Sequence, residues 1–410
     1  MPTATSPPPT STREADLRSI IKSDLAAITE LRHDLHRHPE IMFTEKRTSA
    51  AVARELTALK IQHKAGLARG TGVLGFIPAT GKGAGAKTVA LRADMDALPI
   101  HEKTGKAYAS QSPGFMHACG HDGHTSMLVG VAKALSKMSE RPHNVLLVFQ
   151  PAEEGGAGGE KMCDEGCLSG KVLGTKADVI YGLHGWPDLP VGVVATRTGP
   201  LLAATDEFHI TVRGKGGHAA YPHACIDPIV IASHIVTALQ TIASRHANPL
   251  DSVVCTVGSF HGGEANNVIP DFAELIGTIR TLKAETRKSA ETELRRIVTG
   301  IAEGLGGKAE IDWRVGYPAT FNHPEATERF RRVAREALGA AKVLEREHPT
   351  MGGEDFSFYG KHVPACFFFL GLRPESQATY PNLHTPEFDF NDEALPVGIE
   401  VMTRLATAPL

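Results

Sequence analysis

The chain has 410 residues, 42% of them apolar, so it is long enough for two domains that each bury a core. Its 46 acidic and 43 basic residues give a formal net charge of −3 and are scattered along the sequence. The chain therefore lacks the basic patch that a nucleic-acid-binding protein needs. No window approaches the ~18 consecutive apolar residues of a membrane-spanning helix. We expect neither nucleic acid nor membrane as a partner.

The N-terminal residues 1–13 are rich in Pro, Ser and Thr and lack the apolar stretch of a secretory signal. They are predicted to form a disordered tail, and the protein is expected in the cytoplasm. Six cysteines are too few for a disulfide framework in a chain of this length, so the thiols should stay reduced. Cys163 and Cys167 have no second Cys or His pair at zinc-finger spacing, which argues against a structural zinc site there.

An alternation of helices and strands is predicted after the tail. Apolar residues recur at helical spacing from Leu17 to Leu35, and Pro39 ends this helix. Three aliphatic strand candidates follow at residues 88–93, 144–150 and 178–182. Helical patterns such as 125–138 lie between them. This order is typical of an α/β domain with a central, mostly parallel sheet flanked by helices.

The pattern changes near residue 200. We expect strands and helices in the order βαββαβ, at residues 208–212, 227–245, 253–259, 273–281, 285–303 and 309–314. This order is that of a ferredoxin-like unit. The α/β pattern then resumes with a helix at 325–338, a strand at 365–370 and a helix at 392–407. We therefore predict a discontinuous first domain at 14–199 and 316–410, with a satellite domain inserted at 200–315.

Polar residues follow each strand candidate of the first domain. Asp94 and Asp96 follow the first, Glu153 and Glu154 the second, and His184 the third. Ligands bind beyond the carboxyl ends of the strands in open α/β sheets. These segments are therefore predicted to bring their polar groups to one edge of the sheet.

One short stretch concentrates possible metal ligands, because Cys119, His121, Asp122 and His124 fall within six residues. Thiolate, imidazole and carboxylate groups together favour a divalent transition metal. A carboxylate that does not bind the metal could accept a proton from the attacking water. The pattern thus favours metal-assisted hydrolysis, while thiol catalysis by Cys119 remains an alternative that needs no metal.

A different motif can be set aside. Residues 81–88 resemble a phosphate-binding loop, but Ala86 stands where the second motif glycine belongs. The segment also precedes a strand instead of joining a strand to a helix, which is the wrong context. It is predicted to be a flexible connection.

At this point a family resemblance becomes clear, carried by separated motifs that run in order from about Arg32 to the C-terminus. They are RHDLHRHPE at 32–40, RADMDALP at 92–99, HACGHDGH at 117–124, FQPAEE at 149–154, GLHG at 182–185, GKGGH at 214–218, NVIP at 267–270, GTIR at 277–280, GGEDF at 352–356 and LHTP at 383–386. The chain resembles the M20 metallopeptidase/amidohydrolase family. Within it, the similar branch contains hippurate hydrolases, N-acyl-amino-acid amidohydrolases and plant indole-acetyl-amino-acid hydrolases.

The resemblance implies a site for two divalent metal ions with Glu153 as the general base. The implied ligands are Cys119, His121, Glu154, His184 and His384. Asp96 is interpreted as a carboxylate that orients a ligand histidine. A thiolate ligand suits zinc, cobalt, nickel or manganese better than magnesium or calcium.

Other roles are expected in the satellite domain, which the resemblance makes a dimerisation or lid domain of a homodimer or higher oligomer. His218 would stabilise the oxyanion of the reaction, often in the partner subunit's site. Arg280 suits a substrate carboxylate, with Asn267 as a nearby donor. Outside the satellite domain, Gly353 would let the backbone approach the substrate closely.

The expected reaction is hydrolysis of the amide bond of a small N-acyl or N-aroyl amino acid of the hippurate type. A dipeptidase or an N-acetyl-diaminopimelate deacetylase of the same family is the nearest alternative. A non-catalytic relative that keeps the fold would need a missing base or ligand, and every expected position is occupied here.

Overall fold

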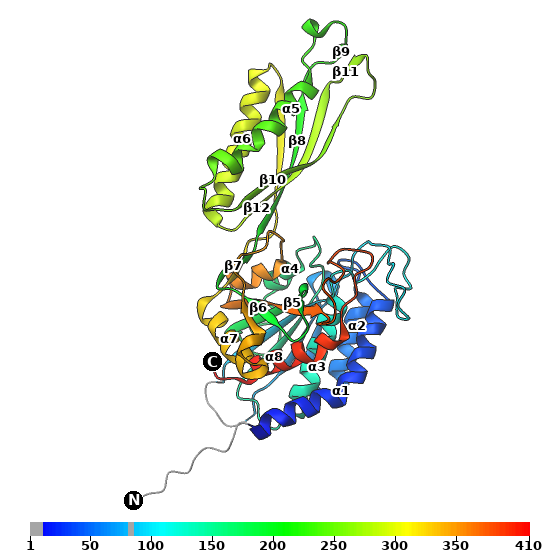
Figure 1. Ribbon diagram of the computed structural model, residues 1–410, viewed down its shortest axis with the longest axis vertical. Coiled ribbons are helices and arrows are strands. Elements are labelled where there is room, and N and C mark those ends of the chain that lie inside the picture. Colours follow the sequence, from blue (N-terminus) through cyan, green and yellow to red (C-terminus); the bar gives the residue numbers. More distant parts are fainter. Residues whose placement is uncertain (1–10, 81–85) are drawn as a thin grey trace, which may run out of the picture. The chain divides into compact units, whose positions relative to one another are not determined.

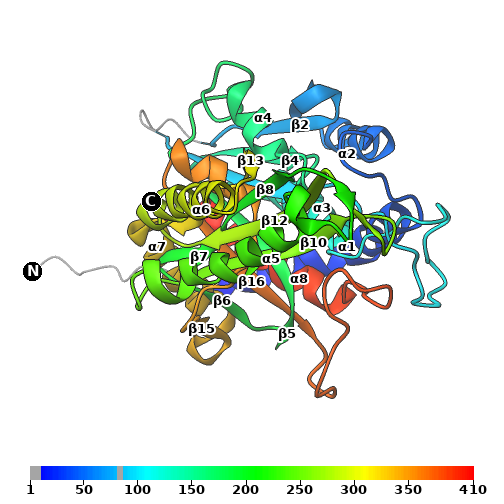
Figure 2. The same ribbon diagram turned by 90° about the horizontal axis from the view of Figure 1, so that it is seen from above.

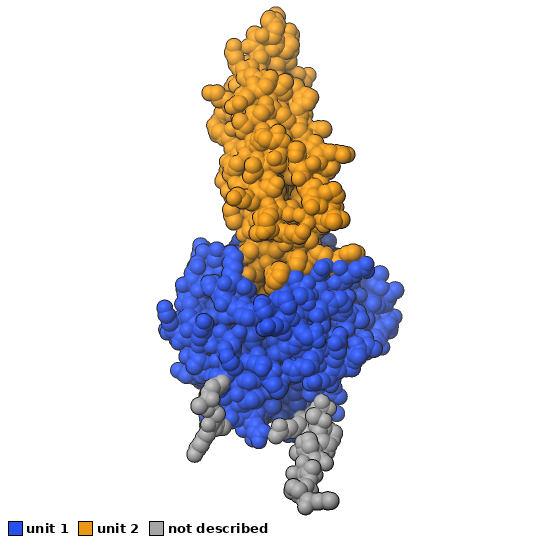
Figure 3. All heavy atoms as spheres, turned by 90° about the vertical axis from the view of Figure 1, so that its left-hand side faces the viewer, with its two compact units in different colours: residues 1–199, 322–347, 358–410 blue, residues 200–321, 348–357 orange. Residues whose placement is uncertain are grey.

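The computed structural model describes residues 11–80 and 86–410. The predicted tail lies outside these residues except at 11–13, which already belong to helix α1 (Ser11–Arg37). The connection at 81–85 also lies outside them. The described chain divides into two compact units, which Figure 3 colours separately. Unit 1 comprises residues 1–199, 322–347 and 358–410, and unit 2 comprises 200–321 and 348–357.

A mixed eight-stranded sheet forms the centre of unit 1, in the order β1-β2-β4-β3-β5-β16-β6-β15. Its strands are β1 (Gln62–Leu67), β2 (Gly72–Ile77), β3 (Thr88–Asp94), β4 (Asn144–Gln150), β5 (Val179–Pro190), β6 (Val194–Thr196), β15 (Val343–Glu345) and β16 (Ala365–Arg373). The central strands β4, β3, β5 and β16 run parallel to one another. The antiparallel pairs are β1–β2, β2–β4 and β16–β6. The predicted fold class is confirmed.

Helices cover this sheet (Figure 1). They are α1, α2 (Lys46–Ala58), α3 (His121–Lys137), α4 (Gly158–Asp164), α7 (Pro324–Leu338) and α8 (Leu395–Thr407). Helices α3 and α8 pack against β3, and α7 packs against β16. Helix α1 packs against α3 and α8 (Figure 2). Its apolar residues Ile28 and Leu35 are buried, as the helical spacing predicts.

The sheet register explains why polar groups gather at one edge. All seven residues of β3 are buried, and so are six of the seven in β4, as expected for strands covered on both faces. Asp94 at the end of β3 pairs with Gln150 at the end of β4. Arg92 pairs with Gly182 in β5, so His184 lies level with Asp94. His184 was predicted to follow a strand. It lies inside one, because β5 continues to Pro190 beside β16.

Unit 2 has the predicted βαββαβ order. Its elements are β8 (Ala204–Arg213), α5 (Pro228–Leu239), β10 (Val253–Gly262), β12 (Phe272–Thr281), α6 (Ala284–Gly304) and β13 (Lys308–Val315). The antiparallel sheet has the order β10-β12-β8-β13, which is that of a ferredoxin-like unit. The predicted helix 227–245 is split, because α5 ends at Leu239 and a π-helical segment occupies Ile242–His246. Unit 2 also reaches Phe321 and includes 348–357, beyond the predicted limits.

No helix in the described part of the chain is long and apolar enough to cross a membrane.

A buried ion cluster joins α1 to the first turn of α3. Arg32 and His36, one turn apart on α1, both contact Asp122 Oδ2, at 3.1 and 2.8 Å. Arg32 also pairs with Asp389 at 3.1 Å, and His36 Nε2 lies 3.3 Å from Glu102. The side chains of Arg32, His36 and Asp122 are fully buried. The cluster therefore fixes the helix that begins at His121.

His36 should make the folded protein less stable at alkaline pH. Burial opposes its charged form, but the carboxylates of Asp122 and Glu102 together outweigh burial and raise the pKa of His36 from 6.5 to about 9. Because the folded-state pKa is the higher one, the stabilisation is complete below pH 6.5 and is lost as pH rises through 9. We expect the free energy of unfolding to fall by up to about 1.4 kcal/mol per pH unit across this window.

Urea unfolding of wild type and His36→Asn at several pH values measures this dependence. The variant should lose the part of the slope that His36 contributes. If the free energy of unfolding depends on pH in the same way in both proteins, His36 is not the cause of this dependence.

Candidate metal centre

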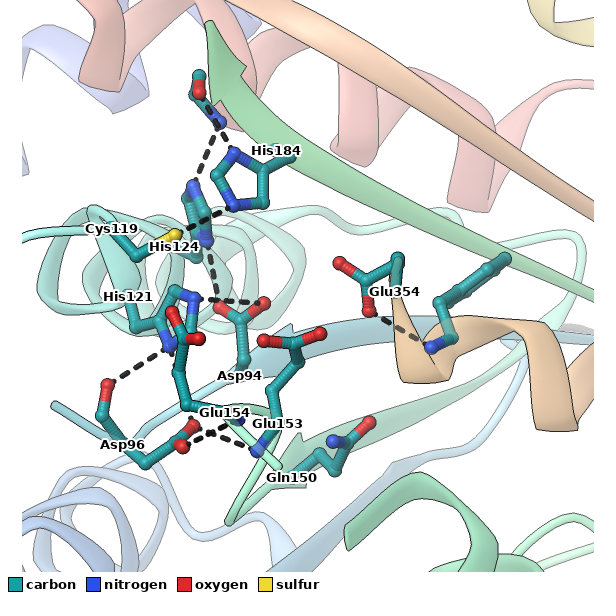
Figure 4. A network of polar contacts seen from close by, with 12 residues as sticks. Asp94, Asp96, Cys119, His121, His124, Gln150, Glu153, Glu154, His184 and Glu354 are labelled. Carbon is teal, nitrogen blue, oxygen red and sulfur yellow. Dashed lines mark hydrogen bonds and ion pairs between the residues drawn. The ribbon is translucent and has the colours of Figure 1, made fainter. Parts of the chain in front are cut away.

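The six groups predicted for the metal site and its base all lie in unit 1, on four separate segments. Cys119 lies in the loop before α3, and His121 is the first residue of that helix. Glu153 and Glu154 lie in the turn after β4, His184 lies in β5, and His384 lies in the loop after β16. Figure 4 shows five of these groups, all but His384, turned toward one another.

The side-chain atoms of these residues are close enough to share metal ions. Cys119 Sγ lies 3.2 Å from His184 Nε2 and 3.3 Å from His384 Nε2. His384 Nε2 lies 3.1 Å from Glu154 Oε1. Three overlapping groups have their ligand atoms within 4.8 Å of one another: Cys119, His121 and His184; Cys119, Glu154 and His384; and His121, Glu153 and Glu154.

Two histidines already have the orientation that a metal ligand needs. His121 Nδ1 donates to the backbone oxygen of Asp96 at 2.9 Å, which leaves Nε2 as the ligating nitrogen. This Nε2 is buried and has no hydrogen-bond partner in the described chain. His184 Nδ1 donates to the Gly185 oxygen at 2.8 Å, so its Nε2 faces Cys119. The nearest charged contact of His121 Nε2 is Asp94 Oδ2, at 3.7 Å. A buried imidazole nitrogen without a hydrogen bond is costly unless a cation takes its lone pair, so the site fits a metal.

The charges at the site point the same way. Burial, followed by Glu154 and Glu153, raises the pKa of the Cys119 thiol well above its usual value. Burial opposes a charge on His121, yet Asp94 and Asp96 raise its pKa to about 10. Cys119 and His121 therefore hold their protons more tightly, because both lie buried among several carboxylates. Metal binding replaces such protons, and this couples metal affinity to pH.

Two buried carboxylates hold the turn that carries Glu153 and Glu154. Asp96 accepts from both backbone amides, Oδ1 from Glu153 and Oδ2 from Glu154, each at 2.9 Å. Glu45 Oε1 accepts from the Ala152 amide at 2.9 Å. Ala152 has φ +55°, a conformation that residues with a Cβ rarely adopt. Hydrogen bonds from three successive amides to these carboxylates thus hold a strained turn. Asp96, which was expected to orient a ligand histidine, accepts two of these bonds.

Two further backbone features shape the site. His384 has φ +62°, and its amide donates to the Ala118 oxygen at 2.8 Å. Non-glycine residues held in this region are frequent at functional sites. Gly120 has φ +87° just before α3, and a Cβ there would approach Phe390 to 3.0 Å. Glycine is therefore needed at the residue that turns the chain from Cys119 to His121.

Three residues that contact this site, Asp94, His124 and Glu45, lie outside the ligands and base that the family resemblance implies. Asp94 accepts from His124 Nδ1 at 2.7 Å and from Arg92 Nη1 at 2.6 Å. Asp94 and His124 belong to the motifs at 92–99 and 117–124, so the sequence did mark both residues. Glu45 had no such signal, because it is a single carboxylate that contacts Ala152 107 residues away in the sequence.

The remaining predicted site residues lie in unit 2. His218, in strand β9 (Gly217–His218), pairs with Val268 in β11 (Val268–Ile269), directly after Asn267. Its Nδ1 accepts from the Ala220 amide at 3.1 Å, so the exposed ring carries its proton on Nε2. Arg280 Nη1 would lie 3.5 Å from a Cβ built on Gly353, so these two residues are neighbours. Burial lowers the pKa of Arg280, and no ion pair of Arg280 is found in the described chain.

Comparisons with known proteins agree with the clustering of these side chains. The sequence model of peptidase family M20/M25/M40 matches residues 90–408. The chain belongs to this family. The resemblance predicted from the motifs is confirmed, and the protein is thereby a member of a family of hydrolases.

Related M20 proteins align along nearly the whole chain. IAA-amino acid hydrolase ILR1-like 4 of Arabidopsis thaliana is 39% identical over 382 residues, which cover 92% of this chain and 84% of that protein. N-acetylcysteine deacetylase of Bacillus subtilis is 38% identical over 387 residues, 93% of this chain and 97% of the deacetylase. The crystal structure of Bacillus subtilis YXEP protein, a dinuclear metal binding peptidase from the M20 family, has a TM-score of 0.80. It is 34% identical and covers 94% of this chain and 98% of its own.

Proposed function

We propose that the protein is a dinuclear metal-dependent amidohydrolase that cleaves the amide bond of N-acyl or N-aroyl amino acids. The products would be a carboxylic acid and a free amino acid. The observation that carries the proposal is the convergence of Cys119, Glu154 and His384 from three segments at 3.1–3.3 Å, with Glu153 beside them. The family match and the dinuclear relative support it.

The proposed ligands are Cys119, His121, Glu154, His184 and His384. Two overlapping ligand groups share Cys119, which supports room for a pair of ions. When bound, such ions lower the pKa of water and polarise the substrate carbonyl. Their identity is proposed to be zinc, manganese, cobalt or nickel, because the set mixes a thiolate with nitrogen and oxygen donors.

Glu153 is proposed as the proton carrier. Its backbone is held by Asp96 Oδ1, and its side chain is 7% exposed, so its carboxylate is positioned with little freedom. It would accept a proton from the attacking water and deliver it to the departing amine nitrogen. One carboxylate then serves both proton transfers, and the enzyme regains its starting protonation state.

Unit 2 is proposed to supply the groups that bind the rest of the substrate. The Nε2–H of His218 is a donor suited to the oxyanion, in this subunit or a partner's site. Arg280 is half-buried with its guanidinium free of ion pairs among the described residues, which suits a substrate carboxylate. Asn267 and the backbone at Gly353 complete the proposed contacts.

The size of the acyl group distinguishes two candidate substrates. The plant relative is named for indole-acetyl amino acids, which favours an aroyl or bulky acyl group such as that of hippurate. The Bacillus relative is named for N-acetylcysteine, which favours a short acetyl group. A deacetylase or a dipeptidase of the same family is therefore the second candidate.

Activity on a panel of acylated amino acids tests the proposal. Hippurate, indole-acetyl amino acids, N-acetyl amino acids and dipeptides should be supplied to protein loaded with Zn²⁺, Mn²⁺, Co²⁺ or Ni²⁺. We expect amide hydrolysis that a chelator abolishes and an added metal restores. Hydrolysis that resists chelation but stops on alkylation of Cys119 would favour thiol catalysis instead.

We further propose a cytoplasmic homodimer or higher oligomer formed through unit 2. Strand β10 has a partner on only one side within its sheet, and an unpaired strand edge can join another chain. On the adjacent helix α5, Val230 is 49% exposed. Light scattering should give at least twice the monomer mass, and a monomer mass would contradict this assembly.

A further inference from the structure

His124 is a buried histidine beside the metal centre with no assigned role. It lies three residues after His121 in α3 and is 2% exposed. Its ring, Asp94 and His121 have ligand atoms within 4.8 Å of one another, a grouping that by itself resembles a metal site.

The hydrogen bonds of His124 exclude it as a ligand in this conformation. The Gly185 amide donates to His124 Nε2 at 2.8 Å, so Nε2 has its lone pair engaged. His124 Nδ1 must then carry the proton, and it donates to Asp94 Oδ1 at 2.7 Å. Arg92 Nη1 donates to the other oxygen of Asp94 at 2.6 Å, which keeps this carboxylate an acceptor. Neither nitrogen of His124 is left for a metal.

The same bonds connect His124 to a proposed ligand. Gly185 follows His184 in β5, and its oxygen accepts from His184 Nδ1 at 2.8 Å. His124 therefore binds the N–H of Gly185, while the C=O of Gly185 binds the His184 ring. The two rings also meet edge to face, with centroids 4.8 Å apart.

We propose that His124 is a positioning residue that sets the orientation of the ligand His184 through Gly185. Asp94 fixes the tautomer of His124, His124 fixes the position of Gly185, and Gly185 directs His184 Nε2 toward Cys119. This inference rests on the proposed metal centre. It gives a role to His124, one of the two histidines of residues 117–124 that are not proposed ligands.

Two substitutions of His124 each remove one of its two hydrogen bonds and keep the other. In His124→Gln the amide oxygen reaches the place of Nε2, so the acceptor for Gly185 is kept and the bond to Asp94 is lost. In His124→Asn the amide nitrogen takes the place of Nδ1, so the bond to Asp94 is kept and the acceptor for Gly185 is lost. His143→Asn is a control, because the hydrogen bond of His143 within the described chain goes to the Ala408 oxygen, at 3.0 Å.

The full chain loaded with Co²⁺ gives the readout, because thiolate and imidazole ligands determine the cobalt absorption spectrum. We expect all proteins to bind the same number of Co²⁺ ions. His124→Asn should shift the cobalt bands and bind Co²⁺ about 10–100-fold more weakly, as is typical when the support of a metal-ligating histidine is removed. His124→Gln and the control should stay close to wild type.

Three results would overturn the inference: loss of one Co²⁺ ion per chain in both His124 variants, which would make His124 a ligand; an unchanged spectrum and affinity in His124→Asn; or a larger effect in His124→Gln. If wild type binds no Co²⁺, the proposed metal centre fails as well.

A second measurement does not depend on the affinities of the variants. In ¹⁵N-histidine NMR spectra of the Zn²⁺-loaded wild type, His124 should carry its proton on Nδ1 and none on Nε2. Its signal is identified by its absence from whichever variant folds. The opposite tautomer, or a metal-shifted Nε2, would overturn the proposal.

Discussion

Glu153→Gln is expected to lower kcat by about 10²–10⁴-fold, the usual contribution of general acid–base catalysis. Glutamine keeps the size of the side chain and leaves the backbone bond to Asp96 Oδ1, 2.9 Å long, in place. It cannot accept the proton from water or return it to the amine. Because Glu154 remains, metal content should not change.

Steady-state kinetics and elemental analysis of the same preparations check this prediction. Glu160→Gln is a matched control, since its carboxylate lies in α4 and is 42% exposed beside Lys161. The control should retain the wild-type kcat. Full activity in Glu153→Gln would refute the base assignment, and a loss of metal would make Glu153 a ligand.

Arg32→Met should destabilise the folded protein by about 3–5 kcal/mol, the usual effect of removing one partner from a buried ion pair. Asp122 would keep its charge in a fully buried position, and Asp389 would lose its 3.1 Å contact with Arg32. Burial alone would raise the pKa of Asp122, but His36 and Arg32 hold it far below its usual value. Removing Arg32 withdraws part of this support.

Urea unfolding measures the effect, with Arg37→Met as the control on the same helix. Arg37 pairs at 2.5 Å with Glu30, whose side chain is 68% exposed. Surface pairs of this kind contribute about 0–1 kcal/mol. Equal stability losses in the two variants would show that the buried ion cluster does not fix α1 to α3.

The central strands were predictable from sequence because both of their faces are buried. Residues 144–150 form β4 as predicted, and β3 exceeds its prediction by only one residue, Asp94. Strand β1 was missed because its sequence, QHKAGL, has a single buried residue, Leu67, and shows no apolar alternation. It is a strand because it pairs with β2, which is a tertiary effect.

Much of the candidate site was also visible in the sequence, since the ligand candidates stand in dense motifs. What the sequence did not reveal were contacts between distant segments. Glu45 reaches Ala152 across 107 residues, and Gly185 meets His124 across 61. Backbone groups take part in both contacts, so no residue type marks them. Only the folded chain brings these groups together.

The proposed function depends most directly on metal ions lying among five side chains of unit 1. Anomalous diffraction from crystals of the Zn²⁺-loaded protein, measured at the zinc edge, tests this. We predict two peaks within coordination distance of ligands drawn from Cys119, His121, Glu154, His184 and His384, with Glu153 bound to neither ion. Zinc peaks only at other positions, or a zinc ion held by Asp94 and His124, would contradict the account.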